Sequence, residues 1–343
     1  MRADSHDVAV VGAGPIGLEM AVALKRAGID YVHLEARQIG HTISWFPPLT
    51  RFFSSNERIA IAGVPLFTPD QSKASREEYL AYLRGIVRQF ELTVRTYEPV
   101  VGIAREDSGF CITTRQRDGT AARYHAGKVI LCTGGTDRPR MLNIPGENLP
   151  HVSHYFHDPH TYFDQRLLIV GGKNSAVEAA LRCHHAGARV SLSYRRDRLP
   201  EKSIKYWLMP EISGLLQSGR IPGHFGTTPV KITPTHVTLA RGGEVLDVPA
   251  DFVLLLIGYE QDNSLLKLAG VRLEGDCGQP AVDPATMQTN IPGLFVAGTV
   301  TGGTQNKFTV FIENCHIHVQ KIMSAITGRP ADATAEEFVQ PES

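Results

Sequence analysis

The order of apolar and polar positions near the start of the chain predicts a buried strand, a tight turn and a helix. Apolar residues 8–11 lead into Gly12-Ala13-Gly14-Pro15-Ile16-Gly17, and a helical pattern follows from 18 to 27. The same order returns with apolar residues 167–170, the turn Gly171-Gly172-Lys173-Asn174-Ser175-Ala176 and a helical segment from 177 to about 185. Apolar runs before a glycine turn and a helix are typical of parallel sheets covered on both faces. The fold class is therefore predicted to be α/β, with two Rossmann-like units.

The residue types of the first turn suit the binding of a dinucleotide. Gly12 permits a tight turn, Gly14 lets the backbone approach a pyrophosphate, and Gly17 allows close packing of the helix. The N-terminus of the helix supplies free N–H groups for the phosphates. Glu35 ends the next predicted strand, 18 residues after Gly17, where the acid that binds the ribose is expected. The alternative is an ordinary tight turn followed by a chance acid.

The second turn differs from the first in its charge. The strand that follows it, 189–194, leads into Arg195-Arg196-Asp197-Arg198. Guanidinium groups at this position suit the 2′-phosphate of NADP, so NADPH is favoured over NADH; a solvated basic turn is the alternative. Lys173 takes the place of the second glycine of the fingerprint, and its side chain either contacts phosphate or crowds the approach to the backbone.

Composition excludes several classes of partner. Thirty-five Lys and Arg balance thirty-five Asp and Glu, so no excess of positive charge attracts nucleic acid or anionic lipid. The 343 residues predict about two domains. No apolar run reaches the roughly 18 residues of a membrane helix, and the first residues do not form a signal peptide, so we expect a cytoplasmic protein. Two dinucleotide sites in one chain imply two cofactors, usually a nicotinamide and a flavin.

The cysteine spacing indicates neither a disulfide framework nor a zinc site, and no metal is predicted. The sequence has no C-x-x-C, and its cysteines are Cys111, Cys132, Cys183, Cys277 and Cys315. Cys111, Cys132 and Cys183 are interpreted as packing residues of strands or helices. Cys315 is either a reactive thiol in the first turn of a helix or a buried packing residue.

Nearly the whole chain resembles the low-molecular-weight thioredoxin reductase group, flavoproteins with two dinucleotide-binding domains. The resemblance rests on Cys132-Thr133-Gly134-Gly135, similar to the crossover segment of that group, and on residues 292–298, similar to its flavin-contacting segment. Thr299 stands where those families have an aspartate. Their C-x-x-C would fall at His154-Tyr155-Phe156-His157, so reduction of thioredoxin by a dithiol relay is excluded. His154 and His157 are interpreted as surface or packing residues rather than metal ligands.

Within this group, five segments are similar to the bacillithiol disulfide reductases: residues 52–58, 143–147, 171–180, 204–207 and 311–314. Lys173 is expected in that family. Ile16 is not, because the family carries a cysteine inside its first glycine loop. If that cysteine takes part in thiol exchange, this chain cannot do so in the same way.

The resemblance implies a discontinuous FAD-binding domain, 1–136 and 259–343, around an NADPH-binding domain, 137–258, and a homodimer. The apolar run 251–258 agrees as the last strand of a buried sheet, and residues 75–90 read as an amphipathic helix. The tail after Gly328 is expected to be loose. The residues predicted to bind the two cofactors are Gly12, Gly14, Pro15, Ile16, Gly17, Glu35, Ala36, Thr42, Ile43, Thr133, Gly134, Gly172, Lys173, Asn174, Ser175, Arg195, Arg196, Lys202, Gly258, Gly298, Thr299, Phe311 and Ile312.

Candidate catalytic residues are Glu313, Asn314 and Cys315, at a helix expected to begin near Phe311 and to direct its N–H groups at the flavin. Glu313 and Asn314 either contact the substrate or only cap the helix. Residues 45–47 either wall the flavin ring or pack in a core. Residues 202–207 either contact NADPH or an acidic substrate, or form a solvated helix face with Trp207 in the core.

These observations predict an NADPH-dependent FAD oxidoreductase that reduces a low-molecular-weight disulfide such as bacillithiol disulfide, by hydride transfer from nicotinamide C4 to flavin N5. The first alternative is a flavoprotein reductase of a quinone, a ferredoxin or oxygen. A flavin monooxygenase is suggested by residues 146–151, although the histidine of its motif comes one place late. A flavin-holding redox sensor is the non-enzymatic alternative.

Overall fold

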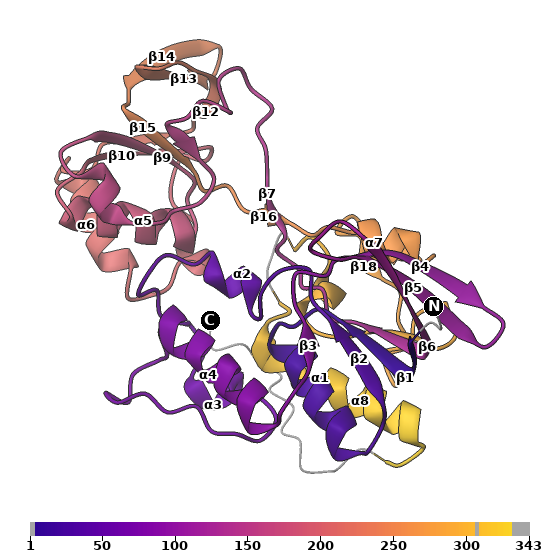
Figure 1. Ribbon diagram of the computed structural model, residues 1–343. Coiled ribbons are helices and arrows are strands. Elements are labelled where there is room, and N and C mark those ends of the chain that lie inside the picture. Colours follow the sequence, from indigo (N-terminus) through magenta and orange to yellow (C-terminus); the bar gives the residue numbers. More distant parts are fainter. Residues whose placement is uncertain (1–3, 306–308, 331–343) are drawn as a thin grey trace. The chain divides into compact units, whose positions relative to one another are not determined.

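The computed structural model describes residues 4–305 and 309–330, so most of the tail after Gly328 lies outside the described residues. The chain divides into two compact units, unit 1 with Met1–Ser44, Leu49–Arg138 and Glu260–Ser343, and unit 2 with Trp45–Pro48 and Pro139–Tyr259 (Figure 1). These limits lie close to the predicted domain boundaries, except that Trp45–Pro48 belongs to unit 2. The chain passes between the units at β7 (Arg138–Pro139) and β16 (Tyr259–Glu260), which pair with each other.

Unit 1 is built on a seven-stranded sheet of order β3-β2-β1-β6-β5-β4, in which β19 also pairs with β6. Its strands are β1 (Asp4–Val11), β2 (Tyr31–Leu34), β3 (Val94–Arg95), β4 (Val100–Glu106), β5 (Gly109–Arg115), β6 (Ala121–Leu131) and β19 (Leu294–Val296). β1 runs parallel to β2 and β6, whereas β4, β5 and β6 are antiparallel neighbours. The carboxyl ends of β1, β6 and β19 therefore meet at one edge of the sheet.

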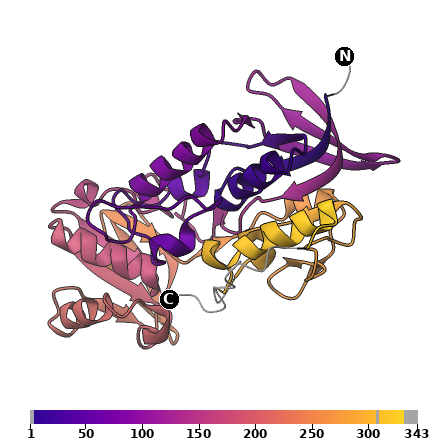
Figure 2. The ribbon, with the colours of Figure 1, turned by 90° about the horizontal axis from the view of Figure 1, so that it is seen from below.

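Two long helices cover one face of this sheet. α1 (Pro15–Arg26) and α8 (His316–Thr327) lie side by side (Figures 1 and 2). They share a core cluster with β1, to which α1 contributes Met20 and Leu24, and α8 contributes Val319 and Ile322. Burying such side chains contributes about 1.5–3 kcal/mol each, so the packing of α1 fixes the turn that precedes it.

Shorter elements complete unit 1. They are α2 (His41–Ser44), α3 (Asn56–Ile59), α7 (Ser264–Leu268), η3 (Thr299–Gly302), η4 (Ile312–Asn314), β17 (Leu273–Glu274) and β18 (Gln279–Pro280). The amphipathic helix predicted for 75–90 is α4 (Arg76–Gln89). It begins with a capping box, in which the side chain of Ser75 accepts the N–H of Glu78 and the carboxylate of Glu78 accepts the N–H of Ser75.

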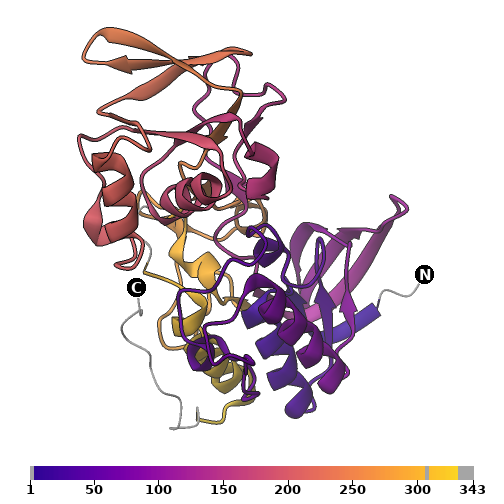
Figure 3. The ribbon, with the colours of Figure 1, turned by 90° about the vertical axis from the view of Figure 1, so that its left-hand side faces the viewer.

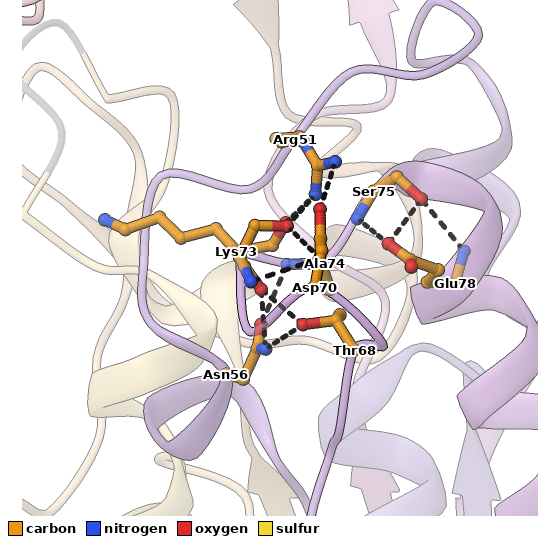
Figure 4. A network of polar contacts seen from close by, with 9 residues as sticks. Arg51, Asn56, Thr68, Asp70, Lys73, Ala74, Ser75 and Glu78 are labelled. Atoms are coloured by element: carbon orange, nitrogen blue, oxygen red, sulfur yellow. Dashed lines mark hydrogen bonds and ion pairs between the residues drawn. The ribbon is translucent and has the colours of Figure 1, made fainter.

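A polar network holds the segment that leads into α4 (Figure 4). Asn56 Oδ1 accepts the N–H of Ala74 at 2.8 Å, which joins the two ends of the segment. The guanidinium of Arg51 donates to the carbonyl of Lys73 at 2.6 Å and to the carboxylate of Asp70 at 3.2 Å. The N–H of Phe52 also donates to the carbonyl oxygen of Ala74 at 2.9 Å. Residues 52–58, one of the segments similar to bacillithiol disulfide reductases, are therefore held by both backbone and side-chain contacts.

Unit 2 is built on a five-stranded parallel sheet of order β11-β10-β9-β15-β8. Its strands are β8 (Val152–Ser153), β9 (Arg166–Val170), β10 (Arg189–Tyr194), β11 (Gly223–Phe225) and β15 (Phe252–Leu255). The other elements are η1 (Pro159–Tyr162), α5 (Asn174–His185), η2 (Glu201–Ser203), α6 (Met209–Gln217), β12 (Thr228–Ile232), β13 (His236–Arg241) and β14 (Glu244–Pro249).

Both faces of this sheet are buried, as its continuous apolar strands predict. Leu167 and Ile169 of β9 pack in the cluster that includes α5 and α6. Leu168 and Val170 point the other way, toward the antiparallel sheet β12-β13-β14, drawn in orange in Figure 3. Parallel sheets and a glycine turn before a helix in each unit confirm the predicted α/β class. In the part of the chain that the structure describes, no helix is both long and apolar enough to span a bilayer.

Candidate functional site

The first glycine turn lies at the carboxyl end of β1, and its backbone leaves no room for side chains at two of its glycines. Gly12 has a φ of +102°, and a Cβ there would lie 2.4 Å from the carbonyl oxygen of Cys132. A Cβ at Gly17 would lie 1.9 Å from the carbonyl oxygen of Gly12. Gly12 therefore sets the turn, and Gly17 brings α1 against it, as the residue pattern predicts.

Gly14 is different, because a Cβ there would meet no atom within 4 Å. It is the N-cap residue of α1, followed by Pro15 at the first helical position, and no described side chain caps the helix. The free N–H groups and the positive end of the helix dipole therefore border open space beside a residue without a side chain. This arrangement fits the pyrophosphate of a dinucleotide, which needs both the N–H groups and the close approach.

Two residues at the end of β2 brace this turn. Glu35 accepts the N–H of Ala13 and the N–H of Arg37, each at 2.7 Å. The pKa of its carboxyl is raised overall, because burial raises it by more than these two N–H groups lower it. Ala36 follows it on the surface. His33 was not anticipated: its Nε2 lies 2.9 Å from the carbonyl oxygen of Gly12, and burial lowers its pKa to about 4 despite this bond. The neutral ring donates to the turn at neutral pH.

Three further segments converge on this turn from distant parts of unit 1. The N–H of Gly40, just before Thr42 and Ile43 in α2, donates to the carbonyl oxygen of Ala13 at 3.0 Å. A Cβ at Gly135, directly after Thr133 and Gly134, would lie 2.7 Å from the carbonyl oxygen of Thr299. A Cβ at Gly298 would lie 3.3 Å from that of Ile16. The structure thus brings together these predicted flavin-site segments; their contact with a cofactor remains a proposal.

The segment from Phe311 to Cys315 differs from the helix expected there. A single 3₁₀ turn, η4, comes first, and α8 begins only at His316, with Cys315 at its N-cap. The side chain of Asn314 accepts the N–H of Phe311 at 2.9 Å and donates to the carbonyl of Thr309 at 2.7 Å. Asn314 therefore caps this turn, and whether it also contacts a substrate stays open. Ile312 packs in the same cluster as Ile16.

Glu313 and Cys315, for which a contact with the substrate was considered, are both buried. Glu313 is 2% exposed, and its Oε2 lies 3.8 Å from Nη1 of Arg58. Cys315 is 0% exposed, and burial, together with the nearby Cys132 and Glu19, raises the pKa of its thiol. A thiol that stays protonated inside the core is a poor nucleophile. The interpretation of Cys315 as a buried packing residue fits the structure better.

A half-buried polar cluster that the sequence analysis missed supports the start of α8. His316 Nδ1 lies 2.7 Å from Glu19 Oε2, and Nε2 lies 2.9 Å from the carbonyl oxygen of Arg58. Burial lowers the pKa of His316, but the bond to Glu19 and its charge prevail and raise it. The cluster joins α1, α3 and α8. The two side chains are 297 positions apart, so no local pattern shows the pair.

The second glycine turn, in unit 2, is crowded at both glycines and open at the lysine. A Cβ at Gly171 would lie 2.4 Å from the carbonyl oxygen of Leu256, and one at Gly172 would lie 2.4 Å from the Tyr194 ring. Lys173 is exposed, takes the N-cap position of α5 with extended backbone, and no described side chain caps this helix. The lysine therefore fits the turn without strain, at the free N-terminus of α5.

Positive charge gathers around this helix terminus. Burial lowers the pKa of Lys173, and the charges of Arg140, Arg195 and Arg196 lower it further. Arg140 was not anticipated; its N–H donates to the carbonyl oxygen of Gly258 at 3.0 Å. Four cations beside free N–H groups are an arrangement that suits a polyanion.

The remaining predicted residues of unit 2 lie around the same terminus. Ser175 and Lys202 are exposed. Asn174 Oδ1 accepts the N–H of Lys205 at 2.8 Å, which ties the segment after η2 to the start of α5. Tyr206, which follows Lys205, is 82% exposed, and Trp207 is 43% exposed. Their ring centroids lie 5.0 Å apart. Trp207 is therefore a surface residue, and its interpretation as core is wrong.

Trp45 belongs to unit 2 and packs against two of its tyrosines. Its ring centroid lies 5.6 Å from that of Tyr155 and 6.4 Å from that of Tyr259. At the place of the missing C-x-x-C, His154 Nε2 lies 3.5 Å from Glu147 Oε1, and burial lowers the pKa of His154 although the Glu147 charge raises it. Glu147 also accepts backbone N–H groups of residues 142–144. His154 thus belongs to the support of a loop.

Each unit thus carries a strand, a glycine turn and a helix with a free N-terminus, which defines a protein with two dinucleotide-binding folds. Comparison with known proteins agrees. Residues 9–298 match the family model described as pyridine nucleotide-disulphide oxidoreductase. The chain belongs to this family of oxidoreductases, which use a flavin and a pyridine nucleotide.

Two relatives and one solved structure show which members of this family the chain is similar to. The chain is 35% identical to the bacilliredoxin reductase Bdr of Bacillus subtilis, over 93% of this chain and 97% of that one. The solved structure of the bacillithiol disulfide reductase Bdr (YpdA) from Bacillus cereus matches with a TM-score of 0.90 and 36% identity, covering 95% of this chain and 99% of the other. A ferredoxin–NADP reductase of Ignicoccus hospitalis is 30% identical over 86% of this chain and 90% of its own.

Proposed function

We propose that the chain is an NADPH-dependent FAD oxidoreductase that reduces a low-molecular-weight disulfide of the bacillithiol disulfide class. The observation that carries this proposal is the 36% identity to a bacillithiol disulfide reductase over 95% of the chain, with a TM-score of 0.90. The net reaction takes NADPH, one proton and the disulfide to NADP⁺ and two thiols, which balances electrons and protons.

FAD is assigned to unit 1. The N–H groups at the start of α1 hold its pyrophosphate beside Gly14, and Glu35 lies where the ribose hydroxyls are expected. The same edge of the sheet is lined by residues that follow the ends of β6 and β19, namely Thr133, Gly134, Gly298 and Thr299. Residues from two further segments flank it, namely Thr42, Ile43, Phe311 and Ile312. When bound, the flavin supplies hydride acceptance and two-electron transfer; the chain supplies position and an electrostatic environment.

NADPH is assigned to unit 2. Lys173, Ser175 and the N-terminus of α5 hold the pyrophosphate, and Arg195 and Arg196, at the end of β10, bind the 2′-phosphate. Asn174 orients the segment that carries Lys202 and Tyr206. Gly258 holds Arg140, whose charge adds to the same site.

The chain's own thiols take no part in the proposed transfer. Cys132 and Cys315 are buried in one core cluster, and burial raises the pKa of Cys132 to about 12 and that of Cys315 further. Without a C-x-x-C and with Ile16 in the first turn, electrons reach the disulfide directly from the cofactor. The 30% identity to a ferredoxin–NADP reductase supports a second candidate, in which the acceptor is a ferredoxin.

The test follows the absorbance of the oxidised flavin without oxygen. The purified protein is reduced with one equivalent of NADPH, and bacillithiol disulfide is then added. The proposal expects rapid return of the oxidised band, matched by the release of two thiols per disulfide. A band that stays bleached with disulfide but returns with ferredoxin rejects disulfide reduction and supports the second candidate. The homodimer and the cytoplasmic location stay predictions, which sedimentation and cell fractionation test.

A further inference from the structure

A group of metal-ligand side chains lies on one face of the antiparallel strands β4, β5 and β6 of unit 1, which are labelled in Figure 1. Cys111 of β5 pairs directly with His125 of β6 and with Ala104 of β4. Glu106 stands two residues after Ala104, and side chains two residues apart share a face of a strand. The register therefore places the carboxylate, the thiol and the imidazole together.

The distances within this group are close to those of a metal site. Glu106 Oε2 lies 2.9 Å from His125 Nδ1, and one ligand atom of each of the three residues lies within 4.8 Å of the others. In a tetrahedral zinc site, ligand atoms lie roughly 3.3–3.6 Å apart, given Zn–N, Zn–O and Zn–S lengths of about 2.0–2.3 Å. Side-chain rotations that move the ligand atoms by roughly 1 Å are enough to reach this geometry, and the strand ladder holds the backbone in place.

The chemistry of the three ligands selects the ion. Thiolate and imidazole are preferred ligands of Zn²⁺, whereas Ca²⁺ and Mg²⁺ need six or more oxygen ligands. Ions reach the group from solvent, since the side chains of His125 and Glu106 are 38% and 43% exposed. A water molecule completes four-coordination from the open side.

We propose that Glu106, Cys111 and His125 form a zinc-binding site on the outer face of β4–β6. On binding, Zn²⁺ replaces the hydrogen bond between His125 Nδ1 and Glu106. The thiol of Cys111 releases its proton to solvent, and a Zn–S bond forms as a water ligand leaves the ion, with no change of oxidation state. The site is independent of the proposed disulfide reduction. Its consequence concerns Cys111, which is partly exposed to solvent as Cys277 is; a bound ion shields this thiol from exchange with disulfides.

Zinc binding is measured on the purified flavoprotein, reduced and freed of metal, by competition with a chromogenic chelator. The wild type is expected to bind one equivalent of Zn²⁺ that Cys111→Ser and His125→Ala bind more than about tenfold more weakly. Cys277→Ser, a change at another partly exposed cysteine of unit 1, is the matched control and is expected to bind as the wild type does. The flavin spectrum and the melting temperature of each variant verify folding.

Alkylation of thiols gives a second readout that does not depend on variants. Zn²⁺ is expected to slow the alkylation of Cys111 by iodoacetamide, followed by peptide mass spectrometry, and to leave Cys277 unchanged. Binding that is equal in the wild type, Cys111→Ser and His125→Ala overturns the proposal. So does the absence of wild-type binding at micromolar Zn²⁺, and so does alkylation of Cys111 at the same rate with and without zinc.

Discussion

Replacing Arg195 and Arg196 by alanine should weaken the use of NADPH selectively. Both side chains are exposed at the end of β10, and their charges act on Lys173 at the N-terminus of α5. In the proposed site they bind the 2′-phosphate, which NADH lacks. The variants therefore remove an interaction that NADPH makes through its 2′-phosphate and that NADH cannot make.

The size of the effect follows from the exposure of the two residues. A hydrogen bond to a charged group contributes about 1.5–3 kcal/mol, and the lower end applies to exposed side chains. Since about 1.4 kcal/mol is tenfold in affinity, each alanine is expected to raise KM for NADPH roughly tenfold and the pair roughly a hundredfold. KM for NADH and kcat with either nucleotide are expected to change little.

Steady-state reduction of an artificial acceptor with NADPH and with NADH measures the effect without assuming a physiological acceptor. Arg198→Ala is the matched control, because Arg198 lies in the same turn but does not contribute to the lowered pKa of Lys173. The reasoning fails if KM rises equally for both nucleotides. It also fails if Arg198→Ala has the same effect as Arg195→Ala.

Three further predictions concern single positions. Gly14→Ala should fold normally, because its Cβ meets no atom within 4 Å, yet lose bound flavin; flavin content and melting temperature separate the two effects. Cys315→Ala should retain turnover, because the thiol is buried and its pKa is raised; loss of activity in a folded variant contradicts this. Burial raises the pKa of Asp137 from 3.8 to about 6, so the folded state binds its proton more tightly than the unfolded state does. As the pH rises from 4 to 6, the unfolding free energy of the wild type should therefore fall relative to that of Asp137→Asn, by at most about 3 kcal/mol and by less with solvent screening. Denaturant unfolding at each pH measures this difference.

The two glycine turns could be predicted from the sequence because their geometry depends on single residue types. Gly12 needs a positive φ, and a Cβ at Gly17 would lie on a carbonyl oxygen, so only glycine fits at either position. The glycine spacing in the sequence therefore predicts the turn. The apolar strands before them are buried on both faces, which gives the continuous apolar pattern. Fold class and the main cofactor-site segments follow from such local rules.

The burial of the candidate catalytic residues could not be predicted from the sequence, because exposure is a tertiary property. The residues of 311–315 carry the groups of an active site, but Asn314 is used in a cap and Cys315 in the core. No local pattern distinguishes a thiol at a helix start from one inside a core cluster. Likewise, Trp45–Pro48 lies between two segments of unit 1 in the sequence, yet it belongs to unit 2, where Trp45 packs against Tyr155 and Tyr259.

Two pairs of polar residues could not be predicted from the sequence, because each pair forms only through tertiary packing or strand pairing. Glu19 and His316 meet because α1 and α8 pack side by side, so the pair depends on helix packing between the ends of the chain. Cys111 and His125 meet because β5 and β6 pair in one register, and a slip by one residue would turn either side chain to the opposite face. Spacing rules for metal ligands describe sites within one loop or helix. A site set by strand register escapes them, which is why the absence of a C-x-x-C did not bear on Cys111.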